Sequence, residues 1–172
     1  MPEIQVALAE TDADFDAARA LCRGFQRFFE TDLAEIAHVV ERYYPPAAWD
    51  ALLAELPAVH ARPSGGVLIG RVDGAPMGCA MLRPLDDPGA VELKRMFVDP
   101  AARGLGLARA LLRAACAQAL ADGHEVMRLD TSYIQKPAQA LYRSEGFKGR
   151  GPYYEAPADV LPVLVFMEKR LG

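Results

Sequence analysis

Hydrophobic and polar positions alternate in some stretches of the chain and recur at helical spacing in others. The alternation of Ile4, Val6 and Leu8 predicts a first strand. Residues 11–14 offer side chains that cap helix N-termini, and apolar positions at helical spacing follow them, so we expect a helix that ends near Phe28. The first part of the chain therefore begins with a strand followed by an amphipathic helix.

Two further helical regions are predicted at 33–43 and 47–56, on either side of the proline pair at 45–46. Six aromatic side chains gather in these N-terminal helices, and we expect most of them to pack in the core and one or two to contact a substrate. These aromatic residues are Phe25, Phe28, Phe29, Tyr43, Tyr44 and Trp49.

From Gly66 onward the pattern is mostly that of strands. Residues 66–72 and 77–82 flank an Asp-Gly turn and predict a hairpin, and 91–98 predicts the next strand. A long amphipathic helix at 104–121, a strand at 125–130 and a short helix at 137–145 follow, and the closing strands fall at 147–154 and 163–169.

This order of elements predicts an α/β (α+β) fold in which helices flank a mixed central sheet. We expect residues 1–172 to form a single domain, since a chain of this length with 52% hydrophobic residues can bury one core. The net charge of −4 argues against a nucleic-acid partner. No signal peptide or membrane-spanning run is visible, so we expect a cytoplasmic protein without a membrane partner.

The segment from Val98 to Ala108 has the residues of a phosphate-binding loop at the start of a helix. Backbone N–H groups at a helix N-terminus are unpaired and attract anions. Gly104 and Gly106 let an anion approach the backbone, and Arg103 adds a guanidinium that pairs with phosphate. We therefore expect this loop to hold a pyrophosphate.

Two common phosphate-binding loops fit this segment poorly. A Walker loop needs a lysine after its glycines, and none is present. A dinucleotide fingerprint needs a small residue where Arg109 stands, although Asp130 near the expected acidic position keeps an NAD-dependent oxidoreductase as a minor hypothesis.

The pattern Arg103-x-x-Gly106-x-Ala108 resembles the acyl-CoA loop of the GNAT acetyltransferases. Four other segments resemble that superfamily in the same order. These are 92–98, 128–131, the Ala138-x-x-Leu-Tyr142 and Gly146-Phe147 pair, and the closing stretch from Tyr153 to Glu168. The resemblance is strongest from Gly66 to Leu171, and it identifies the chain as a small bacterial-type member of the superfamily.

This resemblance implies a GNAT fold with about six to seven strands, in which acyl-CoA binds where the two central strands splay apart. It implies an N-acetyltransferase that uses acetyl-CoA, needs no metal, acts on a small-molecule or peptide amine and forms homodimers in many members. The implied cofactor-binding residues are Met96, Phe97, Val98, Arg103, Gly104, Leu105, Gly106, Leu107, Ala108, Gln135 and Tyr142. Gln135 departs from the family's asparagine, which puts its contact in doubt.

Two residues are candidates for the chemistry. Glu92 matches a glutamate that serves some members as general base, yet it equally suits an ion pair with Lys94 or Arg95 or a position that faces solvent. Tyr142 matches the tyrosine that protonates the leaving thiolate, and the alternative is a buried core tyrosine.

Other residues allow simpler interpretations. His38, His60 and His124 lack metal-ligand spacing, and we expect them on the surface or in turns. Residues 130–133 either line the acceptor pocket or simply end a strand. Cys22, Cys79 and Cys116 suit small buried positions, so we expect direct attack by the amine and no acetylated cysteine. A non-catalytic acyl-CoA sensor with the same fold is the alternative function.

Overall fold

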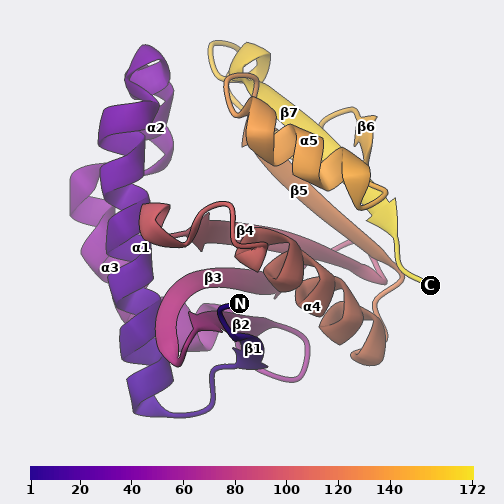
Figure 1. Cartoon of the computed structure of the whole chain (residues 1–172). Coiled ribbons are helices and arrows are strands. Elements are labelled where there is room, and N and C mark those ends of the chain that lie inside the picture. Colours follow the sequence, from indigo (N-terminus) through magenta and orange to yellow (C-terminus); the bar gives the residue numbers. More distant parts are fainter.

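The computed structural model describes residues 1–172 apart from the side chain of Tyr43, and a seven-stranded mixed sheet lies at its centre (Figure 1). The strand order is β1-β2-β3-β4-β5-β7-β6, and every neighbouring pair is antiparallel except β4 and β5. The strands are β1 (Ile4–Leu8), β2 (Gly66–Val72), β3 (Ala75–Pro84), β4 (Ala90–Val98), β5 (Val126–Ser132), β6 (Lys148–Arg150) and β7 (Leu164–Arg170). The predicted mixed sheet flanked by helices is confirmed.

Helices cover both faces of this sheet. The α-helices are α1 (Asp12–Asp32), α2 (Ala37–Tyr43), α3 (Pro46–Val59), α4 (Leu107–Ala121) and α5 (Lys136–Ser144), and short 3-10 turns occupy Ala34–Ile36, Pro100–Ala102 and Leu161–Val163. In the described residues, no helix is long and apolar enough to cross a membrane.

Alternate residues of β2 show how the two faces are divided. Val67 and Ile69 belong to a core shared with α1, α2 and α3, whereas Leu68 belongs to a core shared with α4 and α5. Figure 1 shows the N-terminal helices together on one side, in indigo and purple, with α4 crossing the other side of the sheet. The cores on the two faces are therefore built by different parts of the chain.

The two central strands separate after a short parallel pairing. β4 and β5 pair only from Ala90 with Val126 to Glu92 with Arg128, and they have no further pairing beyond this point. In Figure 1, β5 and β7 lean away from β4 toward α5. The predicted splay is thus present, and it begins immediately after Glu92.

A bulge in β4 lies just beyond the point of separation. Met81 pairs with Lys94 and Cys79 with Phe97, so Ala80 of β3 faces two residues of β4. Arg95, one of these two, has a φ of 48°, which is a left-handed conformation unusual for a side chain of this size. The bulge turns the β4 backbone at the residues that border the opening between the strands.

Several predicted boundaries are wrong. The long helix begins at Leu107 rather than at 104, because Gly104 and Gly106 have φ values of 79° and 91° that no α-helix contains. The predicted strand at 147–154 shrinks to β6, and Pro152 in the remainder lacks the N–H that a ladder needs.

Two N-terminal helices are longer than predicted. The first helix continues to Asp32. The third runs through Pro57 to Val59 instead of ending at Leu56, since the carbonyl of Leu53 that Pro57 leaves unbonded accepts a hydrogen bond from Arg19 Nε at 3.1 Å.

Helix α4 lies close to the sheet because glycines face it. A Cβ atom at Gly78 would lie 2.8 Å from Leu111 Cδ1 and 3.0 Å from the carbonyl oxygen of Phe97. We expect Gly78→Ala to lower the free energy of unfolding by about 1–3 kcal/mol through overpacking. Urea denaturation measures this change.

Gly149→Ala is the matched control, because a Cβ atom there meets nothing within 4 Å. That variant should stay within about 0.5 kcal/mol of the wild type. Equal stabilities for the two alanine variants would contradict the close packing of α4.

Candidate active site

The loop before α4 has the geometry of an anion-binding turn. A Cβ atom at Gly104 or Gly106 would meet nothing within 4 Å, so the backbone of this loop is open on that side. Gly106 is the N-cap of α4, and no side chain caps the first turn of this helix. The N–H groups at the start of α4 therefore keep their capacity to bind an anion, which suits the pyrophosphate of a CoA molecule.

Arg103 and Leu105 lie differently within this loop. The guanidinium carbon of Arg103 lies 5.5 Å from the centre of the Phe28 ring, so α1 contributes to holding this arginine. Leu105 is exposed, whereas Leu107 is buried against the sheet. Leu107, which the resemblance implied as a cofactor-binding residue, therefore also packs in the core beneath α4.

A cavity of about 110 Å³ lies between the N-terminal helices and the separated strands. One wall is apolar and comes from α1, α2 and the turn between them. The other wall comes from β4, β5 and α5 and carries polar groups. The apolar wall includes Phe25, Phe29, Leu33, Ile36, Val39, Val40 and Tyr44, and the polar wall includes Lys94, Arg95, Asp130, Thr131, Ser132, Gln135 and Tyr142.

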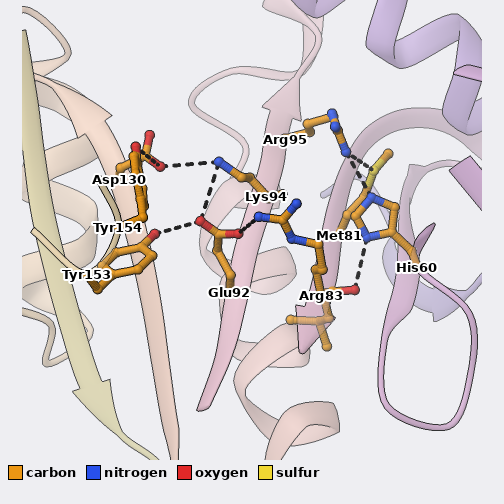
Figure 2. A network of polar contacts seen from close by, with 10 residues as sticks. His60, Met81, Arg83, Glu92, Lys94, Arg95, Asp130, Tyr153 and Tyr154 are labelled. Atoms are coloured by element: carbon orange, nitrogen blue, oxygen red, sulfur yellow. Dashed lines mark hydrogen bonds and ion pairs between the residues drawn. The ribbon is translucent and has the colours of Figure 1, made fainter. Parts of the chain in front are cut away.

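Asp130 places a carboxylate in this cavity. Its Oδ2 lies 3.2 Å from Lys94 Nζ and accepts a hydrogen bond from the Tyr154 hydroxyl at 3.0 Å (Figure 2). Residues 130–132 all line the cavity, so the stretch noted in the sequence does more than end a strand. Among the described residues that line the cavity, Asp130 is the one that carries a carboxylate.

Glu92 lies behind this wall and has several polar partners. Its side chain is 1% exposed, and it is not among the residues that line the cavity. Oε1 accepts a hydrogen bond from the Tyr153 hydroxyl at 2.7 Å and lies 3.4 Å from Lys94 Nζ, while Oε2 accepts one from Arg83 at 2.5 Å. Figure 2 shows Lys94 between Glu92 and Asp130.

Burial raises the pKa of the Glu92 carboxyl, but Lys94, Tyr153 and Arg83 together outweigh burial and hold this pKa below its ordinary value. The ion pair with Lys94 that the sequence allowed is therefore present. The role of Glu92 as general base stays a prediction.

Tyr142 combines a buried ring with a hydroxyl that has no hydrogen-bond partner among the described side chains and backbone groups. It is 7% exposed, packs on Phe147 with ring centres 5.8 Å apart, and lines the cavity. No hydrogen bond to its hydroxyl is made by the residues that the structure describes. Burial, followed by the charge of Asp130, raises its pKa above the ordinary value, so the phenol keeps its proton.

Gln135 and the end of β4 border the cavity from two sides. The side-chain oxygen of Gln135 accepts hydrogen bonds from the Thr131 hydroxyl and from the N–H and hydroxyl of Ser132 at 3.1–3.2 Å, so this oxygen fixes the start of α5. Met96 lines the cavity, whereas Phe97 and Val98 pair with β3. Two of the three residues predicted at 96–98 to bind the cofactor are thus paired with β3.

His60 was predicted at the surface or in a turn, and this prediction is wrong. It is 3% exposed, its Nδ1 lies 3.0 Å from the carbonyl oxygen of Leu82, and its Nε2 lies 2.8 Å from Arg95 Nη1. A carbonyl only accepts, so Nδ1 carries the proton and Nε2 accepts from the arginine. Both partners are more than twenty residues away, and local sequence gave no signal for them.

The remaining chemical groups lie away from the cavity. Cys22, Cys79 and Cys116 are free, and none of them lines the cavity. The described residues contain no group of three or more histidine, cysteine or acidic side chains that could hold a metal ion. The N-terminal aromatic residues reach the cavity through Phe25 and Phe29. The structure does not describe the side chain of Tyr43, which was predicted as part of the same group.

The buried position of His60 makes stability depend on pH. Burial, which outweighs the hydrogen bond to Leu82, lowers its pKa to about 4, below the ordinary 6.5. Between these values the unfolded chain binds a proton that the folded chain refuses, so stability should fall as pH drops from about 6.5 toward 4. The contribution of this one group is about 3 kcal/mol at most.

His60→Asn, which keeps a donor for Leu82, removes this titration, so unfolding midpoints of the two proteins should converge as the pH falls. A constant difference across pH 4–7 would show that His60 does not titrate in this way.

Comparison with known proteins agrees with this geometry. The family model of the acetyltransferase (GNAT) family matches residues 27–147. An uncharacterised N-acetyltransferase of Schizosaccharomyces pombe is 30% identical over 176 residues, which cover 98% of this chain and 96% of that protein. An IAA acetyltransferase of Azospirillum brasilense is 39% identical over 111 residues, covering 64% of this chain and 71% of the relative.

Among solved structures, an acyl-CoA N-acyltransferase from Klebsiella pneumoniae subsp. pneumoniae superposes with a TM-score of 0.65 at 29% identity, covering 100% of this chain and 99% of the other. The matched residues include α2, β4, β5 and α5, which contribute to the cavity walls, and the loop before α4. The chain therefore belongs to the GNAT acetyltransferase family and is an acyltransferase of that family.

Proposed function

We propose that this protein transfers the acetyl group of acetyl-CoA to the nitrogen of an amine, by direct attack within a complex that holds both substrates. The observation that carries the proposal is the cavity at the strand separation, where the carboxylate of Asp130 and the unpartnered hydroxyl of Tyr142 both lie. The loop at Gly104 and Gly106 supports it by offering a place for the pyrophosphate.

The amine must first lose a proton, because an amine with a pKa near ~10 is mostly protonated at neutral pH. Two carboxylates compete for this role. Asp130 faces the cavity, whereas Glu92 lies behind it and has a lowered pKa, which makes it a weaker base. We assign the proton to Asp130 and propose that Glu92 acts as a positioning residue that holds Lys94 beside Asp130.

The amine lone pair then forms the bond to the acetyl carbonyl carbon, the carbon–sulfur bond breaks, and its electron pair stays on the CoA sulfur. Tyr142 gives its proton to that thiolate. Backbone groups of β4 on the side without a strand partner, from Leu93 onward, are available to the carbonyl oxygen during this step. The acetylated nitrogen then loses its second proton, which restores the Tyr142 phenol, and Asp130 releases the first proton to solvent, so that acetyl transfer to an ammonium ion frees one proton in all.

Direct attack also agrees with the places of the cysteines. Cys22 and Cys79 are buried, and Cys116 lies on α4 beside Met127. A covalent acetyl-enzyme intermediate needs a nucleophile within reach of the thioester, and these thiols lie outside the cavity wall.

The roles of the three side chains are tested by Asp130→Asn, Glu92→Gln and Tyr142→Phe, assayed by CoA release with a primary amine. We expect kcat to fall by about 10²–10⁴-fold for Asp130→Asn and Tyr142→Phe, which remove the proton acceptor and the proton donor. The kcat of Glu92→Gln should fall by a smaller factor and keep the pH dependence of the wild type, since this change removes a supporting contact only.

Thermal unfolding with acetyl-CoA and with NAD is the control for folding and cosubstrate binding. All three variants should keep stabilisation by acetyl-CoA, and NAD should stabilise none of them. If Glu92→Gln loses as much kcat as Asp130→Asn and alone shifts the acidic limb of the pH profile, Glu92 is the base. If none of the three changes turnover, the assigned proton acceptor and donor are wrong, and a wild type that binds acetyl-CoA without releasing CoA in the presence of an amine is a sensor.

A further inference from the structure

Arg95, at the bulge of β4, is one of the residues that line the cavity, and its guanidinium has no carboxylate partner among the described residues. In the described residues, no acidic oxygen lies within 4.0 Å of it, whereas Lys94 beside it contacts both Glu92 and Asp130. Its Nη1 donates to His60 Nε2 and lies 3.9 Å from Met81 Sδ, both of which are neutral. Its Nε is buried and has no hydrogen-bond partner in the described residues.

The neighbours of Arg95 hold it in place without neutralising it. His60 donates through Nδ1 to the carbonyl of Leu82, so its Nε2 has only a lone pair to offer the arginine (Figure 2). A partly buried charge that lacks a counterion is unfavourable, and proteins keep such charges where a ligand supplies the opposite one. The planar guanidinium matches a carboxylate better than any other common anion of small metabolites except phosphate.

The cosubstrate's own phosphates approach from another side. Arg95 packs beside Met81, which belongs to the core shared with the N-terminal helices, whereas α4 packs on the opposite face of the sheet and the loop before it meets α1 through Arg103 and Phe28. An anion that reaches Arg95 therefore enters beside the apolar wall of Phe25, Phe29 and Val39. Because the loop before α4 and Arg103 are left to bind the phosphates of the cosubstrate, the charge of Arg95 is left for the acceptor.

We propose that the acceptor is a small amine with a free carboxylate and an apolar side chain, such as an apolar amino acid. Its carboxylate pairs with Arg95, its amine lies toward Asp130, and its side chain packs on the wall formed by the N-terminal helices. The inference rests on the proposed acetyl transfer and adds the class of substrate. His60 is the positioning residue for Arg95.

The test compares acceptors that differ only in the anionic group. L-leucine and L-phenylalanine are assayed against L-leucinamide and L-phenylalaninamide, with acetyl-CoA and the wild-type protein. A lost charge-assisted pair corresponds to roughly tenfold or more in kcat/KM, so we expect the free acids to be preferred by at least this factor.

Arg95→Gln should remove the preference, because it should raise KM for the acids by a larger factor than KM for the amides. Arg95→Lys should restore part of the preference, since it keeps the charge but loses the fork. Arg23→Gln is the matched control, because Arg23 pairs with Asp50 on the surface of α1 away from the cavity.

Each outcome decides the proposal. Equal use of acids and amides by the wild type overturns the inference and leaves the proposed acetyl transfer intact. If acetyl-CoA stabilises the protein against heat but no amine is acetylated, both the inferred acceptor class and the proposed acetyl transfer are wrong. The wild-type comparison needs no variant, so a loss of folding in Arg95→Gln does not hide the result.

Discussion

The early end of the parallel pairing between β4 and β5 is the constraint on which the rest of the site depends. After Glu92 and Arg128 the two strands have no ladder bonds to each other, and the edge of β4 becomes free within a sheet that is otherwise continuous. Unpaired backbone groups inside a protein are costly unless a ligand or water satisfies them. An opening of this kind therefore persists only where the fold uses it.

The bulge and the N-terminal helices turn that opening into a defined cavity. Arg95 adopts a positive φ at the bulge, and such strain in a non-glycine residue is usually held at functional sites by the surrounding structure. Here His60 and Met81 hold its side chain, while Phe25 and Phe29 of α1 close the opposite wall. The site is thus made by segments that lie far apart in the sequence.

Charge is distributed unevenly around this cavity. Glu92, Arg83, Lys94 and Asp130 form one connected set in which each charge has an opposite neighbour. Arg95 lies outside that set, so its charge has no counterion in the described residues. This difference between two adjacent residues of one strand is the basis for the proposed binding of an anionic group beside Arg95.

Local patterns predicted the strands and the glycine loop, because each depends on residues close together in the chain, whereas the family resemblance implied the separation of the central strands. Gly104 and Gly106 precede an amphipathic helix, and the continuous apolar run at 67–69 is typical of a strand that is buried on both faces. The contacts of His60 and Arg95 could not be predicted, since they join residues 35 positions apart without a motif.

The choice between Glu92 and Asp130 shows the same limit within the active site. Both carboxylates lie on strands, and only the three-dimensional separation of those strands shows which one faces the cavity. The sequence named Glu92 through a family resemblance, which says nothing about burial in this chain.

Hydrogen–deuterium exchange with and without acetyl-CoA tests the central claim most directly, namely that the cosubstrate binds at the separated strands and the glycine loop. We expect slower exchange in 93–98 of β4 and in 104–109 at the start of α4, with little change in β1, β2 and α3 and no effect of NAD. Unchanged exchange in both segments under saturating acetyl-CoA, or protection confined to other elements, would contradict it.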